Sequence, residues 1–253
     1  MRFGAIIIGD EIISGKRQDK HMATVIKTLG ERGLVLDWCQ YLADEPALIT
    51  ATLRRTLAGG DAVFSFGGIG ATPDDHTRQC AADAAGTGLV LHPDADREIR
   101  ARFGAEITPQ RLKMGEFPAG SSIIPNPVNR IPGFSVGDHH FLPGFPQMAW
   151  PMMAWVLDTR YPDLFAAGTT GEQAIIVRGA GESQLIDLMN ECLARHPGLK
   201  VFSLPHMGDD DRYVELGVRG VATEVGPAME VLKSGVTALG FRWAKTVEEG
   251  RGT

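Results

Sequence analysis

The segment Gly67-Gly68-Ile69-Gly70-Ala71-Thr72-Pro73-Asp74-Asp75 gathers residue types that handle phosphates. Its glycines let the backbone turn tightly and approach a ligand with no Cβ in the way. Backbone N–H groups in a glycine turn that leads into a helix form a ready anion site. The two carboxylates would repel a phosphate unless a cation bridges them or they accept protons from the ligand. The segment therefore predicts phosphate chemistry with a divalent cation, or recognition of an N–H-rich heterocycle.

Plain turn and cap chemistry explains the same residues. Thr72 can cap a helix that begins at Pro73, and Asp75 then completes a Thr-x-x-Asp capping pattern. The segment is not a Walker loop, because no Gly-Lys-Ser/Thr follows, and it is not a Gly-x-Gly-x-x-Gly dinucleotide fingerprint. Taken alone, it leaves a phosphate site and a structural turn open.

The elements that must position this loop alternate between strands and helices. The hydrophobic patterns predict strands at 3–8, 34–41 and 61–66, and helices at 20–32, 45–58 and from the glycine loop to residue 85. This order implies an α/β fold, a mostly parallel sheet with a layer of helices on each face. Ligands bind such sheets beyond the carboxyl ends of the strands, where Asp10 and the glycine loop both lie.

Residues 92–135 are rich in proline, and we expect a short helix at 97–103 in an otherwise irregular excursion. A returning strand at 139–143 then leads into a helix at 147–157, whose start offers a second anion contact. After a hinge at Gly168–Gly171, strands at 172–178 and 213–221 and helices at 182–194 and 225–235 predict a small α+β module. The expected domains are 1–167 and 168–253.

Composition narrows the functional classes. The chain has 253 residues and a net charge of −6, which argues against nucleic acid as its main partner. No apolar run is long enough to span a membrane, and the N-terminus is too short to be a signal peptide. The three cysteines are widely spaced and fit reduced thiols. We therefore expect a cytoplasmic protein with a small-molecule ligand.

Three motifs in this order resemble the MoaB/Mog domain, also called the molybdopterin-binding or MoCF-biosynthesis domain. They are Gly9–Gly15 with Gln18-Asp19, Gly67–Thr77, and Leu142-Pro143-Gly144-Phe145-Pro146. Further segments resemble the N-terminal region of the CinA (competence/damage-inducible protein A) family, namely Arg111–Met114, Ile124–Pro127, Pro132–Phe134 and Gly179–Ser183. The resemblance covers nearly the whole chain.

The chain departs from the family pattern at three positions. Phe66 stands where a threonine is usual, Ala71 where a proline is common, and His21 where an asparagine is usual. The amidase domain of full-length CinA is not expected, because the chain ends at Thr253. The nicotinamide-nucleotide deamidation that belongs to that domain is therefore not carried over.

The resemblance implies two possible activities. In the CinA-like branch, the domain resembles a metal-dependent pyrophosphatase acting on ADP-ribose or a related dinucleotide. In the molybdenum-cofactor branch, it binds molybdopterin, with adenylyl transfer in some members, and the two aspartates that act there correspond to Asp44 and Asp75. The family also implies a homo-oligomer, a dimer in the CinA branch and a trimer in the Mog branch.

The candidate site follows from the motifs and the resemblance together. The catalytic candidates are Asp75, Asp44 and Asp10, and a divalent metal ion (Mg, Mn, Co or Ni) is expected at Asp74, Asp75 and Asp10. The ligand- and phosphate-binding candidates are Gly67, Gly68, Gly70, Thr72, Ser14, Lys113, Arg130 and Gly144. Helix capping explains Asp44 nearly as well as chemistry does. His139 and His140 are adjacent in a strand, so they point to opposite faces and are expected to be core or surface residues.

Overall fold

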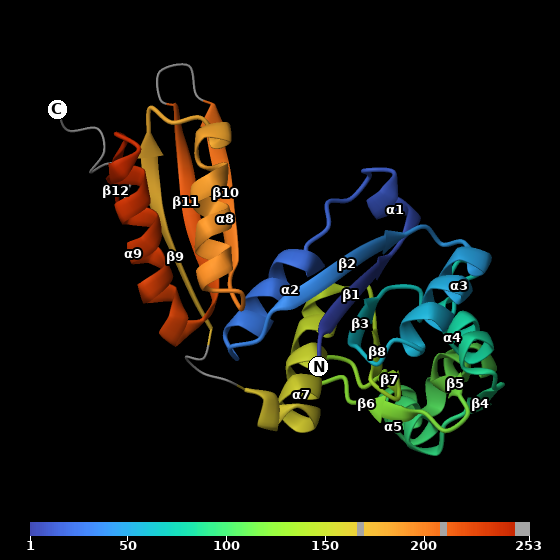
Figure 1. Ribbon diagram of the computed structural model, residues 1–253. Coiled ribbons are helices and arrows are strands. Elements are labelled where there is room, and N and C mark those ends of the chain that lie inside the picture. The colour runs from blue at the N-terminus through green and yellow to red at the C-terminus, as the bar shows by residue number, and fades with distance from the viewer. Residues whose placement is uncertain (166–169, 208–211, 246–253) are drawn as a thin grey trace. The chain divides into compact units, whose positions relative to one another are not determined.

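The computed structural model describes residues 1–165, 170–207 and 212–245. The chain divides into two compact units, Met1–Phe165 and Ala166–Thr253 (Figure 1). The predicted boundary between residues 167 and 168 lies outside the described residues, as do residues 168–169 of the predicted hinge. Within the described ranges, every helix is too short or too polar to cross a bilayer.

The first unit is built on a mixed six-stranded sheet with the order β2-β1-β3-β8-β7-β6. β1, β2, β3 and β8 run parallel, β7 pairs antiparallel with β8, and β6 pairs antiparallel with β7 at that edge. The sheet strands are β1 (Phe3–Ile8), β2 (Leu36–Leu42), β3 (Ala62–Phe66), β6 (Ser122–Ile124), β7 (Gly133–Val136) and β8 (His139–Leu142). The helices are α1 (Asp10–Ile13), α2 (His21–Gly30), α3 (Pro46–Leu57), α4 (Thr77–Ala85), α5 (Pro93–Phe103), α6 (Pro109–Leu112) and α7 (Pro146–Arg160).

Alternation along the strands divides the core into two layers. On one face, Phe64 and Phe66 of β3 pack with residues of α2 and α7. On the other, Val63 of β3 packs with residues of α3, α4 and α5. Figure 1 shows the sheet between these helices. The predicted α/β class, with a mostly parallel sheet between two helical layers, is confirmed.

The proline-rich excursion is more regular than the sequence predicts. α5 begins at Pro93, and β4 (Leu89–Leu91) pairs antiparallel with β5 (Glu116–Pro118). β6 and β7 then extend the main sheet. Prolines sit at the first turns of α5 and α6, where a missing N–H costs nothing. The prolines thus mark helix starts rather than loss of structure.

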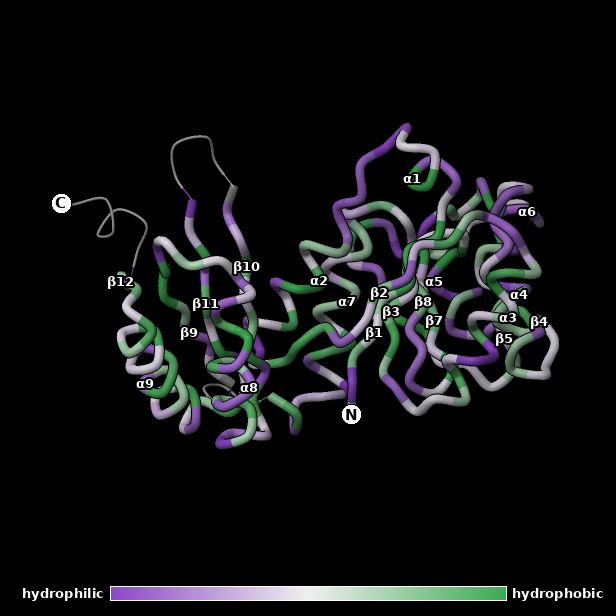
Figure 2. Tube along the Cα trace, turned by 45° about the horizontal axis from the view of Figure 1, so that its top comes forward, coloured by the Kyte–Doolittle hydropathy of each residue, from purple (hydrophilic) through white to green (hydrophobic). Residues whose placement is uncertain are grey.

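The second unit is a four-stranded antiparallel sheet with the order β10-β11-β9-β12. Its elements are β9 (Thr170–Arg178), α8 (Ile186–Arg195), β10 (Lys200–Met207), β11 (Arg212–Val221), α9 (Ala222–Ala238) and β12 (Arg242–Ala244). This β-α-β-β-α-β succession is the split βαβ arrangement. α8 and α9 carry hydrophobic residues among hydrophilic ones and pack against the sheet (Figure 2). The predicted α+β module is confirmed, but β10 and β12 were not predicted.

Candidate functional site

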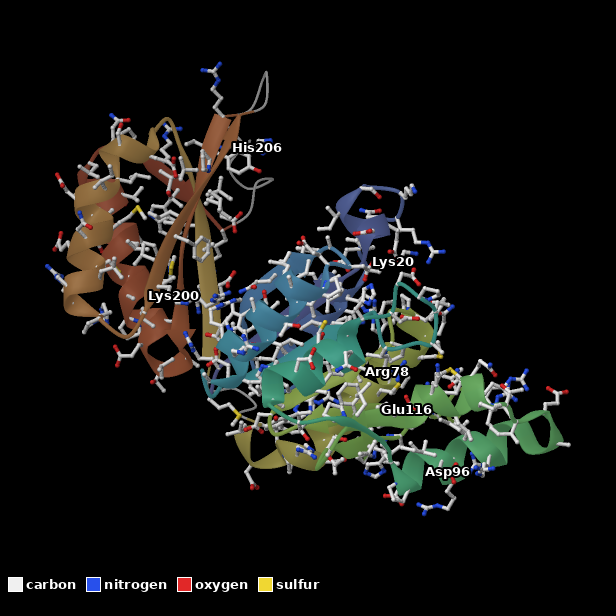
Figure 3. All side chains as sticks on the ribbon, turned by 90° about the vertical axis from the view of Figure 1, so that its right-hand side faces the viewer. Lys20, Arg78, Asp96, Glu116, Lys200 and His206 are labelled. Atoms are coloured by element: carbon white, nitrogen blue, oxygen red, sulfur yellow. The ribbon has the colours of Figure 1, made fainter. Side chains whose placement is uncertain are left out.

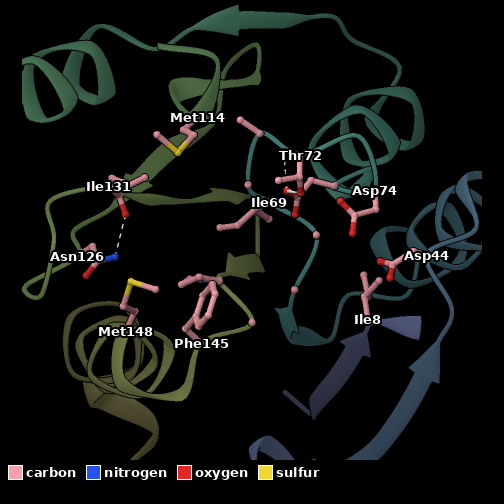
Figure 4. Close-up of a pocket in the computed structure, with 18 of the residues that line it drawn as sticks. Ile8, Asp44, Ile69, Thr72, Asp74, Met114, Asn126, Ile131, Phe145 and Met148 are labelled. Atoms are coloured by element: carbon pink, nitrogen blue, oxygen red, sulfur yellow. Dashed lines mark hydrogen bonds between the residues drawn. The ribbon is translucent and has the colours of Figure 1, made fainter. Parts of the chain in front are cut away.

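A cavity of about 420 Å³ lies beyond the carboxyl ends of β1, β3 and β8 in the first unit. We call its two sides the loop wall and the excursion wall. The loop wall carries the glycine loop and acidic side chains, namely Gly67, Gly68, Ile69, Gly70, Ala71, Thr72, Asp74, Asp75 and Asp44. The excursion wall is mainly apolar and carries Met114, Asn126, Asn129, Ile131, Pro132, Phe145 and Met148. Figure 4 shows the two walls facing each other, with Ile69 between them.

Close packing explains why the loop wall begins with two glycines. Gly67 and Gly68 have φ angles of 103° and 67°, in the region that favours glycine. A Cβ at Gly67 would lie 2.3 Å from the backbone oxygen of Ile8, and one at Gly68 would lie 2.2 Å from Oγ1 of Thr77. Thr77 donates from its hydroxyl to the Gly67 oxygen (3.0 Å) and from its N–H to the Gly68 oxygen (2.9 Å). The first turn of α4 therefore fixes the carbonyl side of the loop.

The N–H side of the loop remains available to a ligand. Within the described part of the chain, the backbone N–H groups of Gly68, Ile69 and Gly70 donate to no acceptor. All three residues line the cavity. Successive N–H groups in a turn of this kind form an anion-binding concavity.

The side chain of Arg78 links the glycine loop to the segment at 113–116. Its guanidinium donates to the oxygen of Gly70 (2.8 Å from Nη2), and also to the backbone oxygens of Lys113 and Glu116. Figure 3 shows Arg78 beside Glu116. Burial lowers the pKa of Arg78 from its ordinary value, but an arginine remains protonated at any physiological pH. Its charge adds positive potential near the loop.

Asp75 holds the far end of the loop. Its Oδ2 accepts from the backbone N–H of Thr72 (2.9 Å) and from the Thr72 hydroxyl. The predicted helix start at Pro73 is wrong, because α4 begins at Thr77 and its N-cap is His76. Asp75 therefore does not complete a capping box. It closes a tight turn that faces the cavity.

Asp10 and Asp44 join the ends of β1 and β2 reciprocally. The Asp10 N–H donates to Oδ2 of Asp44 (2.8 Å), and the Asp44 N–H donates to Oδ1 of Asp10 (3.1 Å). The capping interpretation of Asp44 is wrong, since the N-cap of α3 is Glu45 and no side chain caps that helix. Burial is the main cause that raises the pKa of Asp44, with repulsion from Asp10, Glu11 and Asp74 in addition. Asp44 therefore holds a proton more readily than Asp74, whose pKa is lowered by hydrogen bonding.

The predicted three-carboxylate metal site is not preformed. Among the described residues, no group of three or more His, Cys, Asp or Glu side chains is arranged to hold a metal ion. Asp74 and Asp75 line the cavity, but Asp10 does not. The set of Asp10, Asp74 and Asp75 stays a prediction, and in this structure the carboxylate of Asp10 accepts from the Asp44 N–H. The carboxylates that do line the cavity fit a cation that is held by one or two side chains and by substrate phosphates, as Mg²⁺ often is.

Residues 4–163 match the family described as a probable molybdopterin binding domain. The chain belongs to this family. It is 32% identical over 207 residues to a protein of Caldivirga maquilingensis, with 79% of both chains covered. It is 31% identical over 198 residues to a CinA-like protein of Citrifermentans bemidjiense, with 75% of this chain and 47% of that protein covered. The matched region thus spans about half the length of that CinA-like relative.

A solved structure supports the same grouping. The crystal structure of the protein CinA of Thermoplasma acidophilum, whose function is described as unknown, is 30% identical, with a TM-score of 0.57. The similarity covers 62% of this chain and 98% of that one. The resemblance to the molybdopterin-binding and CinA families is therefore confirmed.

The motif-derived ligand residues divide between the cavity and its surroundings. Gly67, Gly68, Gly70, Thr72 and Gly144 line the cavity. Ser14, Lys113 and Arg130 are not among its lining residues. Lys113 supplies a backbone oxygen to Arg78, and Arg130 forms an ion pair with Glu98 (2.9 Å). The basic side chain on the cavity wall is that of Arg17.

Two of the departures from the family pattern contact each other. His21 stacks on Phe66, with ring centroids 4.5 Å apart and 24° between the ring planes. Nε2 of His21 lies 3.1 Å from the oxygen of Gly144, and burial lowers the pKa of His21. Both rings are buried and neither lines the cavity, so the pair contacts the Gly144 backbone and leaves the space of a ligand open.

Sequence reasoning missed most of the excursion wall. Asn126, Asn129, Met114 and Met148 carry no charge and follow no catalytic spacing. One signal existed, because Asn126 lies in the Ile124–Pro127 motif and asparagine commonly bonds its own backbone in turns. Its buried side chain does so here: Nδ2 donates to the Ile131 oxygen and Oδ1 accepts from the Val128 N–H.

Proposed function

We propose that this protein binds a nucleotide through its phosphates at the glycine loop and hydrolyses the pyrophosphate of ADP-ribose or a related dinucleotide. The observation that carries the proposal is the loop wall. Gly68, Ile69 and Gly70, whose backbone N–H groups have no acceptor in the described chain, line the same cavity as Asp44, Asp74 and Asp75. Backbone N–H donors for phosphate oxygens and carboxylates that can accept a proton thus belong to residues of the same cavity.

The chemistry assigns a role to each part of the loop wall. Water attacks one phosphorus, the bridging P–O bond breaks, and the products of ADP-ribose are AMP and ribose 5-phosphate. The loop N–H groups stabilise the negative charge that develops on the phosphoryl oxygens. Asp75, which accepts from the Thr72 N–H, would accept the proton of the attacking water or orient it. A divalent cation bound with the substrate, near Asp44 and Asp74, would offset the repulsion between these carboxylates and the phosphates.

The test is to incubate the protein with ADP-ribose in Mg²⁺, Mn²⁺, Co²⁺ or Ni²⁺ and to quantify AMP and ribose 5-phosphate. Metal-dependent release of both products in equal amounts supports the proposal. No release with any of these ions, for ADP-ribose and several dinucleotides, contradicts it.

A second candidate is binding of molybdopterin, with or without adenylyl transfer, and the description of the matching family favours it. The terminal phosphate would occupy the same loop, and Asp44 and Asp75 would accept pterin N–H groups. Calorimetric titration with molybdopterin tests it, and absence of saturable binding argues against it. A structure with bound ligand would separate the two candidates, because an adenine and a pterin differ in shape.

A further inference from the structure

A second, smaller cavity of about 220 Å³ adjoins the large one. Asn126 and Pro132 line both cavities, so the 126–132 loop is their common wall. The small cavity also contains Arg130, Glu98 and the half-exposed Trp155 of α7. None of these three side chains takes part in the chemistry proposed for the loop wall.

Arg130 adopts a backbone conformation that is costly for an arginine. Its φ of 62° is the one positive value of a non-glycine residue among the described residues. The left-handed region is unfavourable for a residue with a Cβ, because that atom lies too close to the following carbonyl oxygen. The Arg130 N–H donates to the Asn126 oxygen (3.0 Å), and its Nε donates to Glu98 (2.9 Å). The loop thus holds the guanidinium in the small cavity at the expense of backbone strain, and strain of this kind gathers at functional sites.

The excursion wall of the large cavity has little left with which to recognise the edge of a base. Asn126 uses its amide to hold the loop, and Asn129 accepts from the Ile131 N–H and donates to Sδ of Met148. Figure 4 shows the bond from Asn126 to Ile131 at this wall. The small cavity, by contrast, contains a charged donor and a charged acceptor, Arg130 of the common loop and Glu98 of α5.

We propose that the small cavity receives the nucleobase of the nucleotide whose phosphates bind the glycine loop. Trp155 supplies an aromatic face for stacking, and base stacking on aromatic side chains is largely independent of base identity. Arg130 has five N–H donors, of which Glu98 takes one, and the Glu98 carboxylate is an acceptor. Together they match a heterocycle edge that carries both acceptors and donors. The inference rests on the proposed function, because it takes a nucleotide to be the ligand of the large cavity.

The experiment compares two non-hydrolysable probes by calorimetry in the presence of Mg²⁺. One is α,β-methylene-ADP, and the other is methylenediphosphonate, which has the same phosphates but no nucleoside. The variants are Trp155→Ala, Trp155→Phe and Arg130→Gly, with Trp243→Ala as a control for removing a similarly exposed tryptophan from the other unit. Glycine at position 130 removes the guanidinium and also relieves the backbone strain.

We expect Trp155→Ala, which removes the stacking ring, and Arg130→Gly, which removes the donors, each to raise the Kd for α,β-methylene-ADP at least about tenfold. The Kd of both variants for methylenediphosphonate should stay within about twofold of the wild-type value. Trp155→Phe should retain most of its affinity for α,β-methylene-ADP. Arg130→Gly should not lower the melting temperature. A purely structural role of Arg130 would give a lower melting temperature and equal losses for both probes, and that result overturns the inference.

The remaining outcomes separate this inference from the proposed function. If wild type binds both probes and the variants weaken neither, the base lies elsewhere and only the inference fails. If wild type binds neither probe, nucleotide binding itself fails and the inference fails with it. Turnover of ADP-ribose is measured separately, so loss of hydrolysis alone leaves the base site standing.

Discussion

The two walls of the large cavity are made in different ways. The loop wall consists mainly of backbone and short carboxylate side chains that directly follow parallel strands, and its bends are fixed by contacts such as those of Gly67 and Gly68 with Ile8 and Thr77. The excursion wall consists mainly of flexible or apolar side chains from three separate segments, at Met114, at the loop held by Asn126, and at the start of α7. Backbone geometry tolerates almost no substitution, whereas an apolar wall can be repacked at small cost. We therefore expect the loop wall to determine the rate of the reaction and the excursion wall to determine affinity.

Replacing Asp75 by asparagine should give the largest effect. Asparagine can still accept the Thr72 N–H, so the free energy of unfolding should fall by no more than about 1 kcal/mol. Turnover of ADP-ribose should fall at least about 100-fold, a loss of about 3 kcal/mol in the transition state, because the carboxylate charge is gone. Steady-state kinetics and thermal melting measure the two quantities.

Asp83→Asn is a suitable control for that variant. Asp83 lies on α4, the helix that follows Asp75, is exposed, and does not line the cavity. It should leave turnover unchanged. If Asp75→Asn folds normally and remains active, Asp75 only stabilises the turn, and the loop wall does not determine the rate through this residue.

Acid should weaken the strand that leads into the excursion wall. On β8, His139 is buried with Nε2 at 2.9 Å from Thr56 Oγ1, and burial lowers its pKa from 6.5 to about 4. The unfolded chain then binds more protons than the folded chain below pH 6.5, so stability falls as the pH falls from 6.5 to about 4. At 1.36 kcal/mol per pKa unit, His139 alone accounts for a loss of about 3 kcal/mol by pH 4.

Denaturant unfolding of wild type and His139→Gln at pH 7 and pH 4 tests this. The glutamine amide can still bond Thr56 but does not titrate in this range. The loss of unfolding free energy between the two pH values should be about 3 kcal/mol smaller in the variant. His140, which is also buried and whose pKa burial lowers to about 3, remains in both proteins, so most of its contribution is common to them. Equal losses in both proteins would mean that His139 titrates normally.

The sequence predicted the loop wall far better than the excursion wall, for a physical reason. Strand patterns, the glycines and Asp75 are local signals, and parallel strands bring their carboxyl ends to one edge whatever the details. The excursion wall depends on which distant segments pack together, as when Arg78 bonds the Lys113 and Glu116 backbones. Nor could the sequence reveal that Phe66 and His21, two departures from the family pattern 45 positions apart, stack on each other. Even within the loop wall the start of α4 was placed too early, because the Thr72–Asp75 pair forms a turn that resembles a cap in sequence.

The rigidity of the loop wall can be tested at Gly68. Alanine there must adopt a φ near 67° and place its Cβ 2.2 Å from Thr77 Oγ1. The strain and the clash should lower the free energy of unfolding by about 2 kcal/mol or more. Gly86 is a matched control, with a φ of 69° and no atom within 4 Å of the added Cβ. Gly86→Ala should show the cost of the backbone strain alone, so the difference between the two variants in urea unfolding isolates the contact with Thr77. Equal losses of unfolding free energy would mean that the loop shifts at little cost to relieve the contact.

The smallest expected effect is that of Phe145→Ala, and it tests the other half of the comparison. Phe145 lines the cavity and is exposed, so its removal should change the free energy of unfolding by less than about 0.5 kcal/mol. If the excursion wall provides affinity, losing this ring should raise the KM for ADP-ribose about fivefold, equivalent to about 1 kcal/mol, with kcat within about twofold of wild type. Val128 is equally exposed but does not line the cavity, so Val128→Ala should change neither constant. The signature is opposite to that of Asp75→Asn, in which kcat falls while the substrate still binds. A fall in kcat at constant KM for Phe145→Ala would show that an apolar side chain contributes to the transition state, and the division of labour between the two walls would then be wrong.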